Sequence, residues 1–400
     1  MGRDRAERTC RLKPLPRALL NVILLIAVFA AIEFLASLAF KAGVATRSGK
    51  PAVLYPYHPY LGWEAARSTT FKGTLAGGLH DWKIDTDSLG RSITPYLNTS
   101  DPVVELAILG GSTMFGVGSS GNSTTVPSLI ERELYRRTRL RIEVHNLAVG
   151  GYTSFQEMLS LERFMVTGRV DIVVSISGYN DAFAAAFEKG PEFGLLPDKV
   201  YPKADLVRSM ERGELKVLPV AMSIFLGRLR RWFCAIDLLG KASDRIAPRQ
   251  DQGAWARMPA PEGKEVEHRA RWVMTNYAMM DALAKQNGAR FFMFLQPTAL
   301  TRKALVPAER QCLDSLDRAV VGRLWPVQKV FYDAVRGAEK RFAFYDITHC
   351  LDSLQGPAYA DDAHYLDGGA GAVANAVCDV IVPVVLEAAR ERGVKSDHAP

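Results

Sequence analysis

The chain of 400 residues is longer than one average domain, and its apolar fraction of 48% and charged fraction of 23% are those of a globular protein with a sizeable core. The net charge is +7, but six basic and two acidic residues within residues 1–17 supply +4 of it. About +3 is left for the rest of the chain, where no basic stripe interleaved with aromatic residues occurs. This distribution argues against nucleic acid as a partner.

An apolar run of 23 residues, residues 18–40, follows this basic leader. A helix of that length can span a bilayer, whereas the apolar core of a cleaved signal peptide has only roughly 7–15 residues. Because the positive charges precede the run, we expect an uncleaved signal anchor with the leader in the cytoplasm and the remaining chain across the membrane. Glu33 lies inside the run, either facing another membrane helix or close to the interface.

The chain beyond the anchor divides by pattern into an extended arm at 41–101, a main domain at 102–392 and a short tail at 393–400. The arm is rich in aromatic and turn-forming residues without helical periodicity, so short strands packed on the main domain are expected. In the main domain, strand and helix patterns alternate, which predicts a doubly wound, mostly parallel sheet flanked by helices, of the flavodoxin-like type. The expected strands are 105–110, 141–150, 170–178, 289–297 and 342–348, and the expected helices are 126–138, 154–166, 262–287, 307–340 and 367–392.

An insert at about 183–260 breaks this alternation. Its apolar and basic stretch at 216–239 is expected either to pack in the core or to form an amphipathic element at the membrane or over the site. Beyond the anchor the cysteines are Cys234, Cys312, Cys350 and Cys378. Their spacing fits no zinc motif; Cys312–Cys350 is the disulfide to test first, and buried free thiols are the alternative.

Polar or glycine residues that carry chemistry follow four of the predicted strands. Ser112 comes directly after the strand that ends at Gly110-Gly111, in the stretch LAILGGSTMFGVG. Gly150-Gly151 follows the second strand, and Asn180 follows the third in SGYNDAF. Each of these could also be ordinary turn or capping chemistry.

The fourth place is the loop YADDAHYLDGG, in which His364 follows Asp361 by three residues. This spacing lets one loop supply a base and the carboxylate that orients it. His349 competes for the same role, because Asp346 precedes it by three residues as well. Spacing alone leaves the two histidines open.

Together these four places resemble the SGNH (GDSL-type) hydrolase family, whose motifs run Ser, Gly, Asn and Asp-x-x-His in this order, over roughly residues 104–392. The resemblance implies that Ser112 is the nucleophile, that Ser112, Gly151 and Asn180 form the oxyanion hole, and that His364 is the base oriented by Asp361. It favours His364 over His349. The chain departs from the family pattern at Gly111, where the family name has Asp, and Asp362 is a second carboxylate beside Asp361.

The segments HPYLGW at 58–63, TDSLGR at 86–91 and FLQPT at 294–298 are similar to those of membrane-anchored bacterial members of the family. The resemblance thus implies a single-pass protein of the bacterial inner membrane with a periplasmic catalytic domain. An ordinary α/β-hydrolase is disfavoured because Met114 interrupts its GxSxG pattern. No HExxH or GxxxxGK pattern occurs in the sequence, so no metal and no cofactor is expected.

The leading interpretation is an ester hydrolase that works through an acyl-serine and acts on small acyl esters, such as acetyl esters, of an envelope or exported carbohydrate. The second is an O-acyltransferase of an exported polysaccharide, which would use the same residues. The third is a non-catalytic scaffold of a polysaccharide-assembly complex. Under each interpretation, proteins of envelope assembly are possible partners.

Overall fold

A computed structural model describes residues 17–41, 54–95, 103–187 and 260–393. The chain divides into two compact units; α1 (Arg17–Lys41) belongs to the first, and the sheet belongs to the second. Its 25 residues form one helix over the predicted anchor. The crossing of a membrane by this helix stays a prediction.

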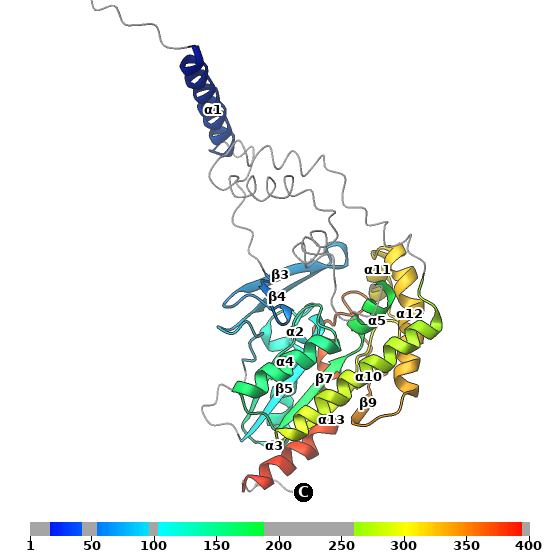
Figure 1. The fold of residues 1–400 in the computed structure, drawn as a ribbon. Helices are drawn as coiled ribbons and strands as arrows, with labels where there is room; N and C mark the ends of the chain where they lie inside the picture. The colour runs from blue at the N-terminus through cyan, green and yellow to red at the C-terminus, as the bar shows by residue number, and fades with distance from the viewer. Residues whose placement is uncertain (1–16, 42–53, 96–102, 188–259, 394–400) are drawn as a thin grey trace, which may run out of the picture. The chain divides into compact units, whose positions relative to one another are not determined.

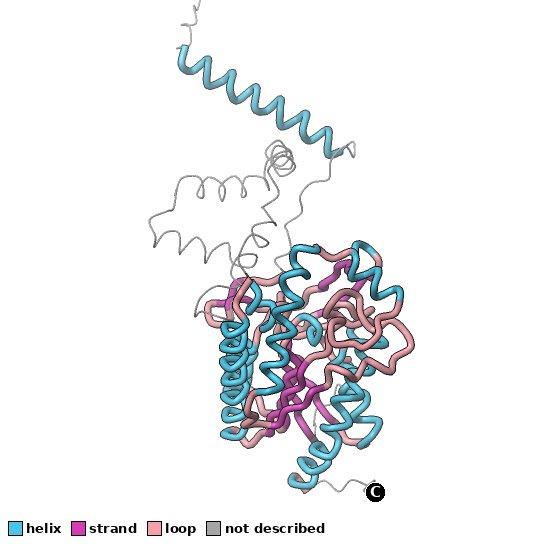
Figure 2. The backbone as a smooth tube through the Cα atoms, turned by 90° about the vertical axis from the view of Figure 1, so that its right-hand side faces the viewer, coloured by secondary structure: helices cyan, strands magenta, loops and turns pink. Residues whose placement is uncertain are grey.

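The second unit is built on a five-stranded sheet in the order β6-β5-β7-β8-β9, with every neighbouring pair parallel. Helices lie on both sides of the strands (Figures 1 and 2). The predicted doubly wound fold is therefore confirmed. The strands are β5 (Val104–Gly110), β6 (Ile142–Asn146), β7 (Ile172–Ser177), β8 (Arg290–Leu295) and β9 (Ala343–Asp346). The helices are α2 (Ser112–Phe115), α3 (Val126–Thr138), α4 (Ser154–Thr167), α5 (Tyr179–Phe187), α10 (Gly263–Gln286), α11 (Pro307–Asp314), α12 (Arg318–Gly337) and α13 (Asp367–Glu391).

The strand order puts the first strand, β5, between the second and the third. The chain passes from β5 to β6 on one side and then crosses back to β7 on the other side of β5. The strand order therefore reverses at β5, and open α/β sheets hold their ligands beyond the carboxyl ends of the strands at such a point. Ser112 lies two residues after the end of β5. The topology alone thus directs attention to this serine.

Alternate side chains of β5 enter two separate cores. Leu106 and Ile108 pack with α3 and α13 on one face, while Ala107 and Leu109 pack with α4, α10 and α12 on the other. Each leucine or isoleucine buried in this way stabilises the fold by about 1.5–3 kcal/mol. Burial on both faces explains why β5 has a nearly continuous apolar run in the sequence.

The N-terminal arm forms two small antiparallel pairs, β1 (Tyr57–His58) with β2 (Gly62–Trp63) and β3 (Thr70–Leu75) with β4 (His80–Asp85). Trp63, Phe71 and Ile84 of these strands are fully buried in the same core as β5. The ring of Phe71 meets that of Phe115 edge-on at 4.9 Å. The arm is thus a part of the domain core.

Two expectations were wrong in detail. The single helix expected at 307–340 is two helices, because the chain turns at Ser315–Asp317 and the Asp317 side chain caps α12 by accepting from Ala319 N–H. Cys312 and Cys350 are free thiols, as is Cys378, so the disulfide between the first two is absent. Cys312 is buried with its Sγ 3.6 Å from the His80 ring. Cys234 lies outside the described residues.

The first residues of the insert expected at about 183–260 belong to α5, which runs to Phe187 and buries Ala184, Ala185 and Phe187 in the core. Residues 188–259, with the apolar and basic stretch, lie outside the described part of the chain. Within that part, α13 meets the length and hydropathy expected of a membrane-spanning helix, and α1 contributes a shorter apolar stretch, Leu24–Leu38. Helix α13 packs against α3 and buries Val373, Val377, Ile381 and Val385 in the domain core, which accounts for its apolar composition.

Candidate active site

Ser112 is the first residue of α2, at the end of a turn made by two glycines. Gly110 has φ 154°, and a Cβ there would lie 2.9 Å from the Ile176 carbonyl oxygen, so only glycine fits the turn. Gly111 is the residue before α2, and a Cβ on it would lie 2.2 Å from Asn180 Nδ2. At position 111 the backbone thus packs so closely against the Asn180 amide that no side chain larger than that of glycine fits without moving it.

The structure brings Ser112, His364 and Asp361 into one hydrogen-bonded row. Ser112 Oγ lies 2.7 Å from His364 Nε2, and His364 Nδ1 lies 2.6 Å from Asp361 Oδ2. The side chains of His364 and Asp361 are 18% and 11% exposed, so the row is shielded but reachable. With the Nδ1 proton directed to Asp361, Nε2 is free to accept the Ser112 hydroxyl proton.

The loop that carries Asp361 and His364 is closed on itself. Asp361 Oδ1 accepts from the backbone N–H groups of Ala363 and His364, at 2.9 and 2.8 Å. The Ala360 N–H donates to the His364 carbonyl at 2.8 Å. The Asp-x-x-His spacing therefore works as a turn in which the carboxylate holds both the backbone and the ring of the histidine.

The row shifts the pKa values of both its charged members. Burial raises the pKa of Asp361, but the His364 charge and the hydrogen bonds it accepts outweigh this and lower the pKa below its ordinary range. Burial lowers the pKa of His364, but the carboxylates of Asp361 and Asp362 outweigh it and raise the pKa above 6.5. Asp361 thus stays ionised beside a histidine that becomes a stronger base.

The competing residues have other partners. Asp362 accepts from the Tyr179 hydroxyl at 2.9 Å, and burial together with the Asp361 charge raises its pKa. His349 is 61% exposed and pairs with Asp352 at 3.1 Å. The arrangement therefore places His364, rather than His349, against Ser112, with Asp361 as its carboxylate.

The structure places Asn180 against Gly111, the residue before Ser112, and Gly151 remains the third donor that the sequence predicts for the oxyanion hole. Asn180 Nδ2 packs on Gly111 and donates one hydrogen to the Tyr152 carbonyl at 2.8 Å, which leaves its second hydrogen available. The backbone N–H groups of Ser112 and Gly151 donate to no other group in the described residues. These three donors could bind the negative oxygen of a tetrahedral intermediate.

A buried polar network under this region was missed from the sequence. Asp181 accepts from Ser154 N–H at 3.1 Å and from Ser154 Oγ at 2.8 Å, which ties the start of α4 to the first turn of α5. Glu157 accepts from Ser175 and Ser177, each at 2.6 Å. Burial raises the pKa of Asp181 to about 6 and of Glu157 to about 7. Ser175 and Ser177 interrupt an otherwise apolar strand, and this pattern could have indicated a buried polar partner in the sequence.

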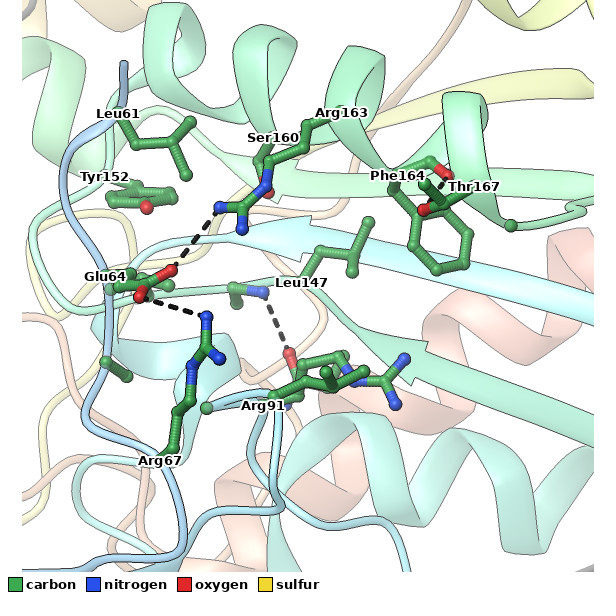
Figure 3. Close-up of a pocket in the computed structure, with 17 residues that line it drawn as sticks. Leu61, Glu64, Arg67, Arg91, Leu147, Tyr152, Ser160, Arg163, Phe164 and Thr167 are labelled. Carbon is green, nitrogen blue, oxygen red and sulfur yellow. Dashed lines mark hydrogen bonds and ion pairs between the residues drawn. The ribbon is translucent and has the colours of Figure 1, made fainter. Parts of the chain in front are cut away.

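A separate cavity of about 370 Å³ lies between the arm and α4 (Figure 3). Figure 3 shows Glu64 between the guanidinium groups of Arg67 and Arg163, which it meets at 3.5 and 3.4 Å. Tyr152 lines this cavity, whereas Ser112 and His364 do not. The cavity is thus lined by Val149 and Tyr152, the residues on either side of Gly150–Gly151, and is separate from the row of Asp361, His364 and Ser112. Within the described ranges, no group of three metal-ligating side chains comes together.

No protein-family model and no curated protein sequence matches the chain. Among solved structures, the chain is similar to TesA, with 14% identity over 70% of this chain and 99% of that one and a TM-score of 0.36. It is similar to the acetyl xylan esterase AlAXEase, with 10% identity, 70% and 100% coverage and a TM-score of 0.35. It is also similar to the lipase Lip_vut3 from a goat rumen metagenome, with 11% identity, 69% and 96% coverage and a TM-score of 0.34.

Proposed function

We propose that the protein is a serine ester hydrolase of the SGNH type, which acts through an acyl-enzyme on Ser112. The observation that carries the proposal is the continuous row from Asp361 through His364 to the Ser112 hydroxyl, next to Asn180. A hydroxyl at 2.7 Å from a neutral imidazole nitrogen is an activated nucleophile. The order of the Ser, Gly, Asn and Asp-x-x-His motifs along the chain supports the same assignment.

The first half of the reaction forms the acyl-enzyme. Ser112 Oγ attacks the ester carbonyl carbon while His364 Nε2 takes the hydroxyl proton, and Asp361 stabilises the imidazolium that results. The carbonyl oxygen becomes an oxyanion that accepts hydrogen bonds from Ser112 N–H, Gly151 N–H and Asn180 Nδ2. When the intermediate collapses, the bond to the alcohol oxygen breaks and His364 returns the proton to the leaving alcohol.

The second half repeats these steps with water. His364 Nε2 takes a proton from the water that attacks the acyl carbon, and the same three donors bind the oxyanion. The bond from the carbon to Ser112 Oγ then breaks, His364 protonates the serine, and a carboxylic acid is released. If a sugar hydroxyl replaces water in this half, the same residues transfer the acyl group.

For the substrate, we propose small acyl esters of an envelope or exported carbohydrate, with the active site outside the cytoplasm. Support comes from the basic leader before the apolar run of α1, an arrangement that retains the leader on the cytoplasmic side. Residues 18–40 would then anchor the domain at the bacterial inner membrane. Cytoplasmic donors such as acyl-coenzyme A would be out of reach of Ser112.

Turnover of p-nitrophenyl acetate by Ser112→Ala tests the proposal. We expect kcat to fall by more than about 10³-fold, because loss of the nucleophile removes the acyl-enzyme path. Ser353→Ala, in an exposed loop position, is the matched control and should retain full activity. Full turnover by Ser112→Ala would refute the assignment. Supplying an acetylated oligosaccharide with an acceptor glycan then separates hydrolysis from transfer by the product formed.

A further inference from the structure

The loop that carries Gly151 is held from behind by the N-terminal arm. Trp63, at the end of β2, donates its indole Nε1–H to the Gly150 carbonyl oxygen at 2.9 Å. The Tyr152 hydroxyl donates back to the Trp63 carbonyl at 2.7 Å, and the two rings meet edge-on at 5.6 Å. Trp63 is 1% exposed; its hydrogen bond with Tyr152 is buried, and its hydrogen bond to Gly150 is half-buried.

The bonded carbonyl belongs to the peptide group that also contains Gly151 N–H. In a trans peptide the C=O and the N–H lie in one plane and point in opposite directions, and the described residues contain no cis peptide. Fixing the Gly150 oxygen toward Trp63 therefore directs Gly151 N–H away from the arm. The carbonyl of Tyr152, the next residue, accepts a hydrogen bond from Asn180 Nδ2 at 2.8 Å, so the loop that carries Gly151 is joined directly to the Asn180 side chain.

This peptide would otherwise rotate easily. Glycine flanks it on both sides, and Gly151 has φ +83°, a conformation that glycine enters and leaves at little cost. A flip would exchange a donor for an acceptor at the point where negative charge develops. The arm also crowds the loop sterically, because a Cβ on Gly150 would lie 2.5 Å from the Tyr55 hydroxyl.

We propose that Trp63 is a positioning residue, whose indole N–H holds the Gly150–Gly151 peptide so that Gly151 N–H points at the oxyanion. The arm would thus complete the oxyanion hole without contacting the substrate. This inference rests on the proposed serine ester hydrolase. It assigns a role in catalysis to the HPYLGW segment, which lies outside the four motifs.

The test is the steady-state kinetics of Trp63→Phe in the full-length chain. Complete loss of an oxyanion donor costs about 10² to 10³ in kcat, and here the donor stays on the chain but is free to rotate, so kcat should fall about 10- to 100-fold. KM should change less than about threefold, because the interaction is made only in the transition state. Trp82→Phe, on β4 of the same arm, is the matched control and should retain the kcat of the wild type.

A second variant separates the hydrogen bond from the packing of the ring. Replacing Trp63 by benzothienylalanine keeps the size of the bicyclic ring but puts sulfur in place of N–H. The inference predicts that this variant loses as much kcat as Trp63→Phe while its melting temperature stays near that of the wild type. Wild-type kcat in the benzothienylalanine variant would overturn the positioning role of Trp63. This variant decides the question even if Trp63→Phe fails to fold. Turnover by Ser112→Ala would instead overturn the proposed function, so the two failures are distinguishable.

Discussion

Gly111 is the position at which a single methyl group should disable the site. In Gly111→Ala the new Cβ would lie 2.2 Å from Asn180 Nδ2 and 3.3 Å from Asn180 Cγ, whereas ordinary contacts begin at 3.4 Å. The amide must therefore retreat by about 1 Å, which takes a donor that works at about 2.7–3.1 Å out of reach of the oxyanion. We expect kcat for p-nitrophenyl acetate to fall by about 10²- to 10³-fold, which corresponds to about 3–4 kcal/mol.

A double-mutant cycle shows whether the methyl group acts through Asn180. Asn180→Ala alone should lose a similar amount of kcat, and adding Gly111→Ala to it should cost less than about threefold, because no amide is left to displace. Gly121→Ala is the control, since a Cβ there meets nothing within 4 Å and the backbone is extended. Wild-type kcat in Gly111→Ala, or full additivity of the two changes, would refute this reasoning.

Three further predictions follow from the charges and the anchor. The acid limb of kcat/KM should have its midpoint above pH 6.5, because His364 must be neutral to act as a base and its neighbouring carboxylates raise its pKa; a midpoint below 6.5 would contradict this. The raised pKa of Glu157, about 7 against 4.5, makes the native state retain a proton, so about 3 kcal/mol of stability is present below pH 4.5 and lost as the pH rises through 7. In urea unfolding, the free energy of unfolding of Glu157→Gln should change less with pH between 4.5 and 7 than that of the wild type. The same pH dependence in both proteins would contradict this role of Glu157. A reporter fused after Pro400 should give active alkaline phosphatase and silent β-galactosidase, and the reverse pattern would overturn the proposed topology.

The fold was predictable because its strands, apart from the edge strand β9, are mostly buried and each is followed by a turn. Five apolar runs separated by helical periodicity specify a doubly wound sheet, and the observed strand order agrees with it. The break between α11 and α12 was missed because apolar periodicity continues across it, and only Asp317 marks the new start. The predicted disulfide between Cys312 and Cys350 was wrong because the spacing of two cysteines along the chain does not give the distance between their sulfur atoms.

The sequence could supply the members of the candidate site but not their contacts. Spacing left His349 and His364 equal, and the resemblance to a family favoured one of them. The geometry adds the 2.7 Å contact between His364 and Ser112, which no local pattern contains because 252 residues separate the two. The HPYLGW segment stood out in the sequence, but its role could not be predicted for the same reason, since the hydrogen bond from Trp63 to Gly150 spans 87 residues.

Mass spectrometry of the acyl-enzyme tests the central claim most directly. The full-length protein is mixed with p-nitrophenyl acetate, quenched in acid within the first turnovers, and digested. We expect one acetyl group on the peptide that contains Ser112, and none on that peptide in Ser112→Ala. His364→Ala should also show no acetyl group there, because the hydroxyl is then not activated. Turnover of the ester with no acetyl group on Ser112, or with the label on another residue, would contradict the account.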